Sequence, residues 1–115
     1  MQRDFCENSA GQMRQEEEAM YESKMKSAET DRLFEAILSL KNEEECYRFF
    51  DDLCTFGELQ SITQRLEVAR LLREGKTFTQ ISEETGVSSA TITRVNKCIS
   101  YGTGGYEMVL DRCKK

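Results

Sequence analysis

The sequence of 115 residues contains no histidine, no proline and no tryptophan. Without histidine the chain cannot build a Ser-His-Asp or Cys-His catalytic site or a His-ligated metal site. Its apolar runs fall short of the roughly 18–20 residues that cross a bilayer, and its N-terminus lacks the apolar core of a secretory signal. These absences predict a cytoplasmic protein that is not an enzyme, with no membrane association, no metal and no cofactor.

Cysteine is present, but no two cysteines form a C-x-x-C pair; they are Cys6, Cys46, Cys54, Cys98 and Cys113. The odd count and the wide spacing argue against a disulfide framework and against a zinc site. We therefore expect reduced thiols that behave as small hydrophobic residues in a core. A thiol-based redox enzyme or sensor is the alternative, and it would need a thiol of lowered pKa.

Charge is distributed unevenly along the chain. Residues 1–57 hold seven basic and fourteen acidic side chains, whereas residues 58–115 hold nine basic and seven acidic ones. The overall charge of −5 argues against a general nucleic-acid coat,. It leaves open a protein that meets DNA through one local basic surface, because screening limits each charge to its near surroundings. The second half of the chain is the part suited to an anionic partner.

The spacing of apolar residues predicts an all-α fold. Residues 1–28 are polar, and we expect them to form a flexible N-terminal extension, with residues 29–115 forming one helical domain. Helices are predicted from about Thr30, from the Asn-x-x-Glu pattern that begins at Asn42, and from after Gly57 to Gly75. The stripe predicted for the third of these helices consists of Leu59, Ile62, Leu66, Ala69 and Leu72. We interpret such stripes as core, and a core this thin favours pairing with a second copy.

Residues 77–100 have the pattern of a helix-turn-helix. Thr77 or Thr79 can cap a short helix that runs to about Thr85, with Phe78 and Ile81 facing inward. Gly86 supplies the left-handed turn residue and Val87 an apolar plug after it. Ser88 or Ser89 then caps a longer helix whose inward residues are Ile92, Val95 and Ile99.

The opposite face of that longer helix is suited to a DNA groove. Its first turn is made of small side chains, so its backbone can approach base edges closely, and its N-terminus favours a phosphate. Lys76, Arg94 and Lys97 are placed to contact phosphates. The predicted DNA contacts are Lys76, Thr79, Gln80, Ser88, Ser89, Ala90, Thr91, Thr93, Arg94 and Lys97. A short helix over residues 107–113 completes the chain and must dock on the domain or on a partner subunit.

Residues 33–112 resemble the Trp repressor superfamily, in particular its YerC/YecD type. The most specific segments are ECYRFFDDLCT, QRLEVARLLREGKT and ATITRVNKCISYG. The resemblance implies an intertwined homodimer that acts as a transcriptional repressor by binding a double-stranded DNA operator through its helix-turn-helix. It also implies that the first three helices form the interwoven core and that the last helix packs across the subunits.

The resemblance further implies an effector pocket, which would involve Gln64, Arg65, Thr91, Arg94 and Val95. Thr91 and Arg94 match positions that contact the ligand or the adjoining phosphate in that family. Val95 stands where the tryptophan-binding protein has a glycine, and Gln64, followed by Arg65, stands at the position of its ligand-clamping arginine. We therefore expect that tryptophan is not the effector.

Two other interpretations use the same residues differently. A helical protein-interaction adaptor would keep the helix-turn-helix fold without binding DNA, and its acidic first half would then be the working surface. A DNA-binding module of the response-regulator kind resembles residues 75–99, but the three preceding helices and the terminal helix fit it poorly.

Overall fold

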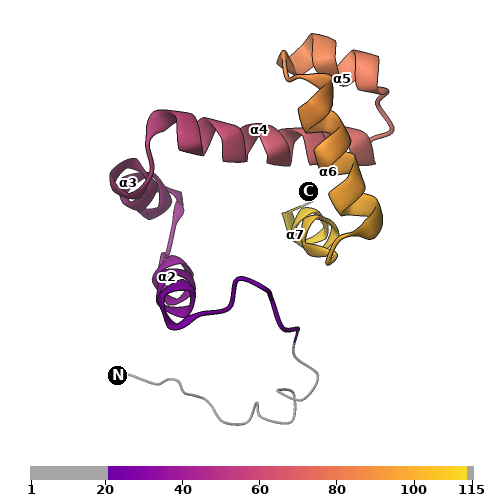
Figure 1. The fold of residues 1–115 in the computed structure, drawn as a ribbon. Helices are drawn as coiled ribbons and strands as arrows, with labels where there is room; N and C mark the ends of the chain where they lie inside the picture. The colour runs from indigo at the N-terminus through magenta and orange to yellow at the C-terminus, as the bar shows by residue number, and fades with distance from the viewer. Residues whose placement is uncertain (1–20, 114–115) are drawn as a thin grey trace. The chain divides into compact units, whose positions relative to one another are not determined.

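The structure, a computed structural model, describes residues 21–113 and is helical throughout its regular parts. Figure 1 shows the helices, which are α2 (Ala28–Leu38), α3 (Glu43–Leu53), α4 (Phe56–Arg73), α5 (Phe78–Thr85), α6 (Ser89–Tyr101) and α7 (Gly105–Cys113). No strand occurs among the described residues, which confirms the all-α prediction. The chain divides into two compact units, residues 1–42 and residues 43–115. Most of the extension predicted over residues 1–28 lies outside the described residues.

The first unit contains α2, which begins two residues before the predicted start at Thr30. Ser27 is its N-cap, and the Ser27 hydroxyl accepts a hydrogen bond from the backbone N–H of Thr30 at 3.0 Å. This cap sets the start of the helix because it satisfies a backbone donor that no helical carbonyl can reach. None of the residues of α2 is buried, and Leu38 is 83% exposed. The apolar face of α2 is therefore uncovered among the described residues of its own unit.

In the second unit, α3 ends at Leu53 and α4 begins at Phe56. Thr55 and Glu58 form a capping box: the Glu58 backbone N–H donates to the Thr55 hydroxyl at 3.1 Å, and the Thr55 N–H donates to the Glu58 carboxylate at 2.8 Å. The sequence pattern had placed the break at Gly57, which is wrong, because Gly57 lies in the first turn of α4. The reciprocal cap satisfies two orphan donors and outweighs the low helix propensity of one glycine.

A small core forms where the C-terminal half of α4 meets α5 and α6 (Figure 1). Its buried side chains are Val68, Ala69, Leu71, Ile81, Val87, Ile92 and Val95. Of the stripe predicted for α4, only Ala69 is fully buried, and Ile62 and Leu66 are 45% and 43% exposed. Val68 and Leu71 lie outside that stripe and are buried because several helices cover this end of α4. The first half of α4 therefore keeps much of its apolar surface exposed.

The last helix, α7, docks on the domain itself and begins two residues before the predicted start at residue 107. Its Tyr106 and Leu110 pack against the core. Arg73, the last residue of α4, also holds this helix, with the guanidinium Nη2 at 2.6 Å from the Asp111 carboxylate. Of the two alternatives predicted for this helix, docking on its own domain is therefore observed.

Candidate functional site

Two helices joined by a short turn occur where the sequence predicts them, with Gly86 between them. Gly86 has φ 75°, the left-handed conformation that glycine adopts without steric cost,. The Thr85 hydroxyl, which donates to the Ile81 carbonyl at 2.7 Å, accepts from the Val87 N–H at 3.1 Å. Ile81 and Val87 are buried on either side of the turn, whereas Phe78, also predicted to face inward, is 39% exposed. Phe78 is the first residue of α5 and lies beyond the end of the core.

The two faces of α6 differ as the sequence predicted. Ile92 and Val95 are fully buried, and Ile99 packs against the core. The opposite face is exposed over its whole length, through Ala90, Thr93, Arg94, Lys97 and Tyr101. Since a helix repeats every 3.6 residues, this face is continuous from the small-residue tip to the two cations. The tip and the cations are thus presented together on one side of the motif.

Six of the ten predicted DNA contacts have exposed side chains that form no hydrogen bond or ion pair with another described residue. They are Thr79, Ser89, Ala90, Thr93, Arg94 and Lys97. No acidic residue lies between Thr85 and Ser100 to compete for the two cations. These six positions form the part of the candidate surface that is available to a ligand in this structure.

The other four predicted contacts are engaged in holding the motif together. The Gln80 side-chain oxygen accepts from the Thr77 N–H at 2.9 Å, in a capping box that begins α5. The Ser88 hydroxyl accepts from the Thr91 N–H at 3.2 Å and lies 3.3 Å from the Thr91 hydroxyl. Lys76 forms an ion pair that is described next. The Thr77-x-x-Gln80 pattern is a capping-box signature. The structural role of Gln80 could therefore have been predicted from the sequence.

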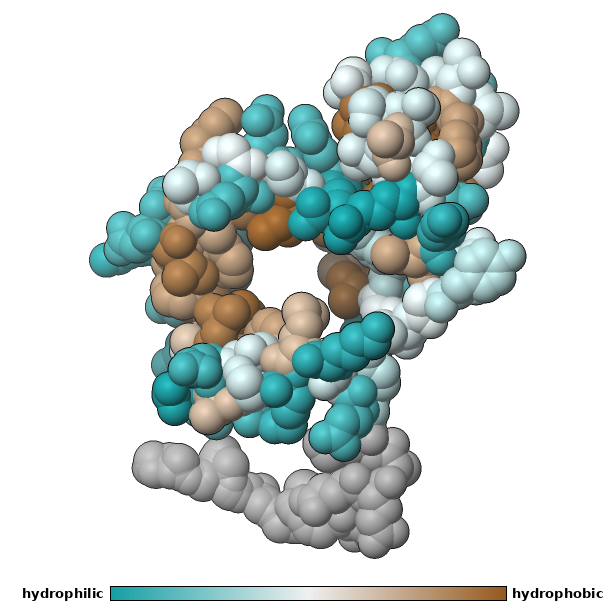
Figure 2. Space-filling model, viewed as in Figure 1, coloured by the Kyte–Doolittle hydropathy of each residue, from teal (hydrophilic) through white to brown (hydrophobic). Residues whose placement is uncertain are grey.

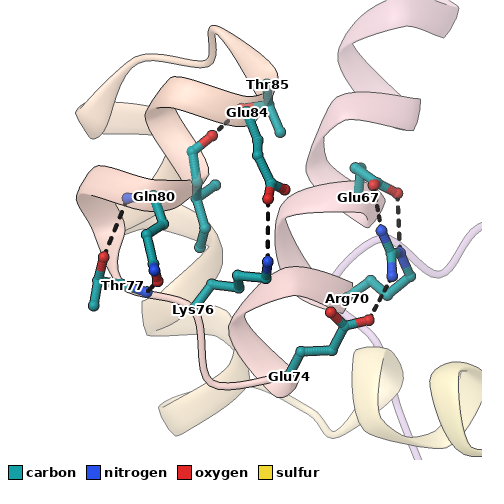
Figure 3. A network of polar contacts seen from close by, with 9 residues as sticks. Glu67, Arg70, Glu74, Lys76, Thr77, Gln80, Glu84 and Thr85 are labelled. Carbon is teal, nitrogen blue, oxygen red and sulfur yellow. Dashed lines mark hydrogen bonds and ion pairs between the residues drawn. The ribbon is translucent and has the colours of Figure 1, made fainter.

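Sequence reasoning missed a group of ion pairs that borders the motif (Figure 3). Lys76 lies in the connection between α4 and α5, and its Nζ is 3.1 Å from a carboxylate oxygen of Glu84 on α5. On α4, Arg70 lies between Glu67 and Glu74 and bonds to both. Hydrogen bonds from Arg70 lower the pKa of the Glu67 carboxyl below its ordinary value, against the opposing effect of partial burial,. Only the spacing of these residues on their helices could have suggested the pairs on α4.

The residues predicted for an effector pocket do not share one environment. Val95 is fully buried in the core, and Arg94 on the same helix is exposed. Gln64 and Arg65 on α4 and Thr91 on α6 are half-buried. The Val95 side chain is packed within the core, among residues of α4 and α5.

An open apolar cavity of about 570 Å³ lies beside the exposed half of α4. Its lining includes Ile62, Leu66, Cys98, Tyr106 and Val109, with Arg65 as its charged member. Arg65 is the one member of the predicted effector set that lines it. The cavity is therefore distinct from a pocket that the five predicted residues would form together.

The four described cysteines are free thiols, and none of them is a core residue of the chain. Cys46, Cys98 and Cys113 are exposed, and Cys54 is half-buried; Cys6 lies outside the described residues. The expectation that the thiols act as small core hydrophobes is therefore wrong for these four within a single chain. Among the described residues, no group of histidine, cysteine, aspartate and glutamate side chains has the arrangement of a metal site, and no helix there is long and apolar enough to span a membrane.

Comparisons with known proteins agree on one family. The family model for the Trp repressor protein matches residues 28–114. The YerC protein of Bacillus subtilis (strain 168), itself uncharacterised, is 62% identical over 92 residues, which cover 80% of this chain and 88% of YerC. The crystal structure of a candidate Trp repressor from Staphylococcus aureus has 51% sequence identity and a TM-score of 0.76, and covers 78% of this chain and 90% of that one. A TrpR-like protein from Eubacterium eligens ATCC 27750 has 50% identity and the same TM-score, and covers 78% of this chain and 93% of its own. With this extent of sequence and structural agreement, the chain belongs to the Trp repressor family, a family of transcriptional regulators.

Proposed function

We propose that this protein is a cytoplasmic, homodimeric transcriptional repressor that binds double-stranded DNA of defined sequence through α5 and α6. The observation that carries the proposal is the exposed face of α6, where a small-residue tip precedes Arg94 and Lys97. Small side chains let the helix enter the major groove, and the cations reach the flanking phosphates. Thr79 on α5 and Ser89, Ala90 and Thr93 on α6 are the proposed contacts at the groove.

The decisive experiment is selection of bound duplexes from a random DNA pool. A symmetric dimer carries two recognition helices, so the selected sites are expected to be palindromes with half-sites about 34 Å apart. Recovery of a palindrome establishes the binding activity and the symmetry together. A pool that stays random after repeated rounds at low ionic strength overturns the proposal and favours the protein-interaction adaptor.

The two cations of α6 provide a second test. Arg94→Ala and Lys97→Ala are each expected to weaken binding and to reduce the slope of log K against log salt by about 0.9, the value for one lost phosphate contact. Arg48→Ala is the matched control, because Arg48 is an exposed arginine on α3, away from the helix-turn-helix. Equal slopes for the wild-type protein and the α6 variants show that Arg94 and Lys97 do not contact phosphates.

The homodimer is supported by apolar surface that the single chain leaves exposed. Figure 2 shows hydrophobic side chains on the surface of α3. Tyr47 and Leu53 on α3 and Phe56 at the start of α4 are about half-exposed or more. The apolar cavity beside α4 adds to this surface. We interpret the exposed apolar side chains of α3 and α4, together with this cavity, as the surface that a second copy covers.

Tryptophan is not the effector in our proposal, since Val95 fills the core at the critical position of α6. Calorimetry with millimolar tryptophan is expected to show no binding heat. A clear saturable heat would contradict the assignment of Val95 as a residue that blocks an indole.

A further inference from the structure

The ion pair between Lys76 and Glu84 gives one of the predicted DNA contacts an anionic partner. The Lys76 backbone N–H donates to the Leu71 carbonyl at 3.1 Å, so the start of this side chain is anchored at the end of α4. From there its ammonium reaches Glu84 in the last turn of α5, as Figure 3 shows. The lysine and glutamate side chains are 35% and 50% exposed. The pair is therefore accessible to a polyanion such as DNA.

Glu84 shares a face of α5 with a predicted DNA contact. It follows Gln80 by four residues, and residues at that spacing lie one above the other on a helix. The Gln80 side chain is engaged in the capping box of α5, so Glu84 is related to the candidate surface through Lys76, one of the predicted phosphate contacts. Sequence reasoning counted Lys76 as an available cation, whereas the structure gives it an anionic partner.

Lys76 is the cation that forms an ion pair with Glu84. Arg70, the other cation at this edge, already forms hydrogen bonds with both Glu67 and Glu74. The group of five residues thus combines three carboxylates with two cations and carries a net charge of −1. Both cations of this group are therefore already paired with carboxylates.

The main consequence of the pair is electrostatic. A solvent-exposed ion pair contributes little to folding stability, because water screens the attraction. Binding to DNA of arbitrary sequence, in contrast, depends almost wholly on phosphate contacts, and each contact adds about 0.9 to the salt slope. Removing one cation from that sum weakens binding to arbitrary sequences, while contacts to base edges are unaffected.

We propose that Glu84 is a specificity-determining residue: by holding Lys76 in an ion pair, it suppresses binding to duplexes of arbitrary sequence. This inference rests on the proposed DNA-binding function and assigns a role to a residue outside the predicted contact set. Lys76 then contributes little to binding while Glu84 is charged.

The first test compares Glu84→Gln with Glu83→Gln in the full-length chain, using a mixed-sequence duplex and fluorescence anisotropy at several salt concentrations. Both variants lose one negative charge from the same end of α5, but only Glu84 holds Lys76. We expect Glu84→Gln to bind about three- to tenfold more tightly than wild type at low salt, with a slope steeper by about 0.9. Glu83→Gln is expected to change affinity by less than about twofold, since Glu83 restrains no lysine. Equal effects of the two variants overturn the inference.

A double-mutant cycle with Lys76→Gln isolates the pair. In the wild-type background Lys76→Gln is expected to weaken binding to the mixed duplex by less than about twofold, because Lys76 is held by Glu84. In the Glu84→Gln background the same change is expected to cost about three- to tenfold, because the lysine there contacts phosphate. Equal costs in the two backgrounds overturn the inference while the proposed function stands. A wild-type chain that binds no duplex at all overturns both.

Discussion

The polar residues of the helix-turn-helix divide into those that build the motif and those that remain available for contact. Gln80 belongs to the first group because its side chain completes the capping box of α5. Thr79, next to it, is exposed and forms no side-chain hydrogen bond with a described residue. A residue type that is suited to reading bases is therefore no guarantee that the side chain is free to do so.

This division predicts different effects for two adjacent substitutions. Gln80→Ala is expected to lower the free energy of unfolding by about 0.5–1 kcal/mol, because it removes a side-chain hydrogen bond to an otherwise unpaired amide. Thr79→Ala is expected to leave stability nearly unchanged and to affect DNA binding instead. Urea denaturation followed by circular dichroism measures the first effect. A loss of stability for Thr79→Ala equal to that for Gln80→Ala would be the wrong outcome.

The lowered pKa of Glu67 predicts a dependence of stability on pH. Hydrogen bonds from Arg70 stabilise the charged carboxylate in the folded chain. Stability from this pair is therefore present above the ordinary glutamate pKa and is lost as the pH falls through the lower folded value. Glu67→Gln is expected to reduce stability at neutral pH by well under about 1 kcal/mol, because both side chains are about half exposed,.

Thermal melts of the Glu67→Gln variant and the wild-type protein at neutral and at strongly acidic pH check this prediction. The difference between the two proteins is expected to shrink toward acidic pH, where the wild-type carboxyl is protonated as well. A difference that is the same at every pH would assign the effect to packing instead of charge.

At the scale of helices, sequence reasoning succeeded where local chemistry decides the outcome. The turn at Gly86 and the buried face of α6 were predictable, because a left-handed glycine and a 3.6-residue period leave few alternatives,. The start of α4 was not found, because the capping box at Thr55 outweighed the signal of Gly57. The burial of Val68 was missed as well, since it depends on helices that reach α4 from elsewhere in the sequence.

The corner between α6 and α7 depends on a glycine for a steric reason. A Cβ atom added at Gly102 would overlap the backbone oxygen of Cys98, which cannot move without distorting the end of α6. Gly102→Ala is therefore expected to lower the free energy of unfolding by about 1–3 kcal/mol. Gly57→Ala is the matched control, because a Cβ there meets nothing within 4 Å. Since Gly57 lies in the first turn of α4, the control is expected to stabilise the chain by about 0.5–1 kcal/mol.

Denaturation with urea distinguishes the two alanine variants. Opposite signs for Gly102→Ala and Gly57→Ala support the steric account of the corner. A neutral Gly102→Ala would show that the end of α6 relaxes at little cost, so that the position of α7 does not depend on this glycine.

At the scale of the whole molecule, the described residues bury few apolar side chains and leave many large ones exposed. Among residues 21–113, the buried core comprises seven side chains from α4, α5, the turn and α6. Large apolar side chains on α3, on the first half of α4 and on α7 stay exposed. Sequence reasoning interpreted the stripe on α4 as core, and the single chain does not bury most of it. If a second copy covers the stripe on α4, the stripe is core in the dimer and exposed in the single chain. Its burial then cannot be found within one chain.

The dimer is tested most directly on α4, at a position where the single chain has no need of an apolar residue. Leu66 is 43% exposed and lines the apolar cavity. In a monomer, Leu66→Glu would place a charge at the surface at little cost, whereas in a dimer it would bury an unpaired carboxylate in the interface.

We expect light scattering coupled to gel filtration to give twice the chain mass for the wild-type protein and for Gln60→Glu, an exposed control on the same helix. Leu66→Glu is expected to run at the mass of one chain and to lose DNA binding, because two half-sites are then no longer bound together. A wild-type protein that elutes as a single chain at micromolar concentration, with unchanged behaviour in Leu66→Glu, would show that the apolar surface of α4 serves some partner other than a second copy.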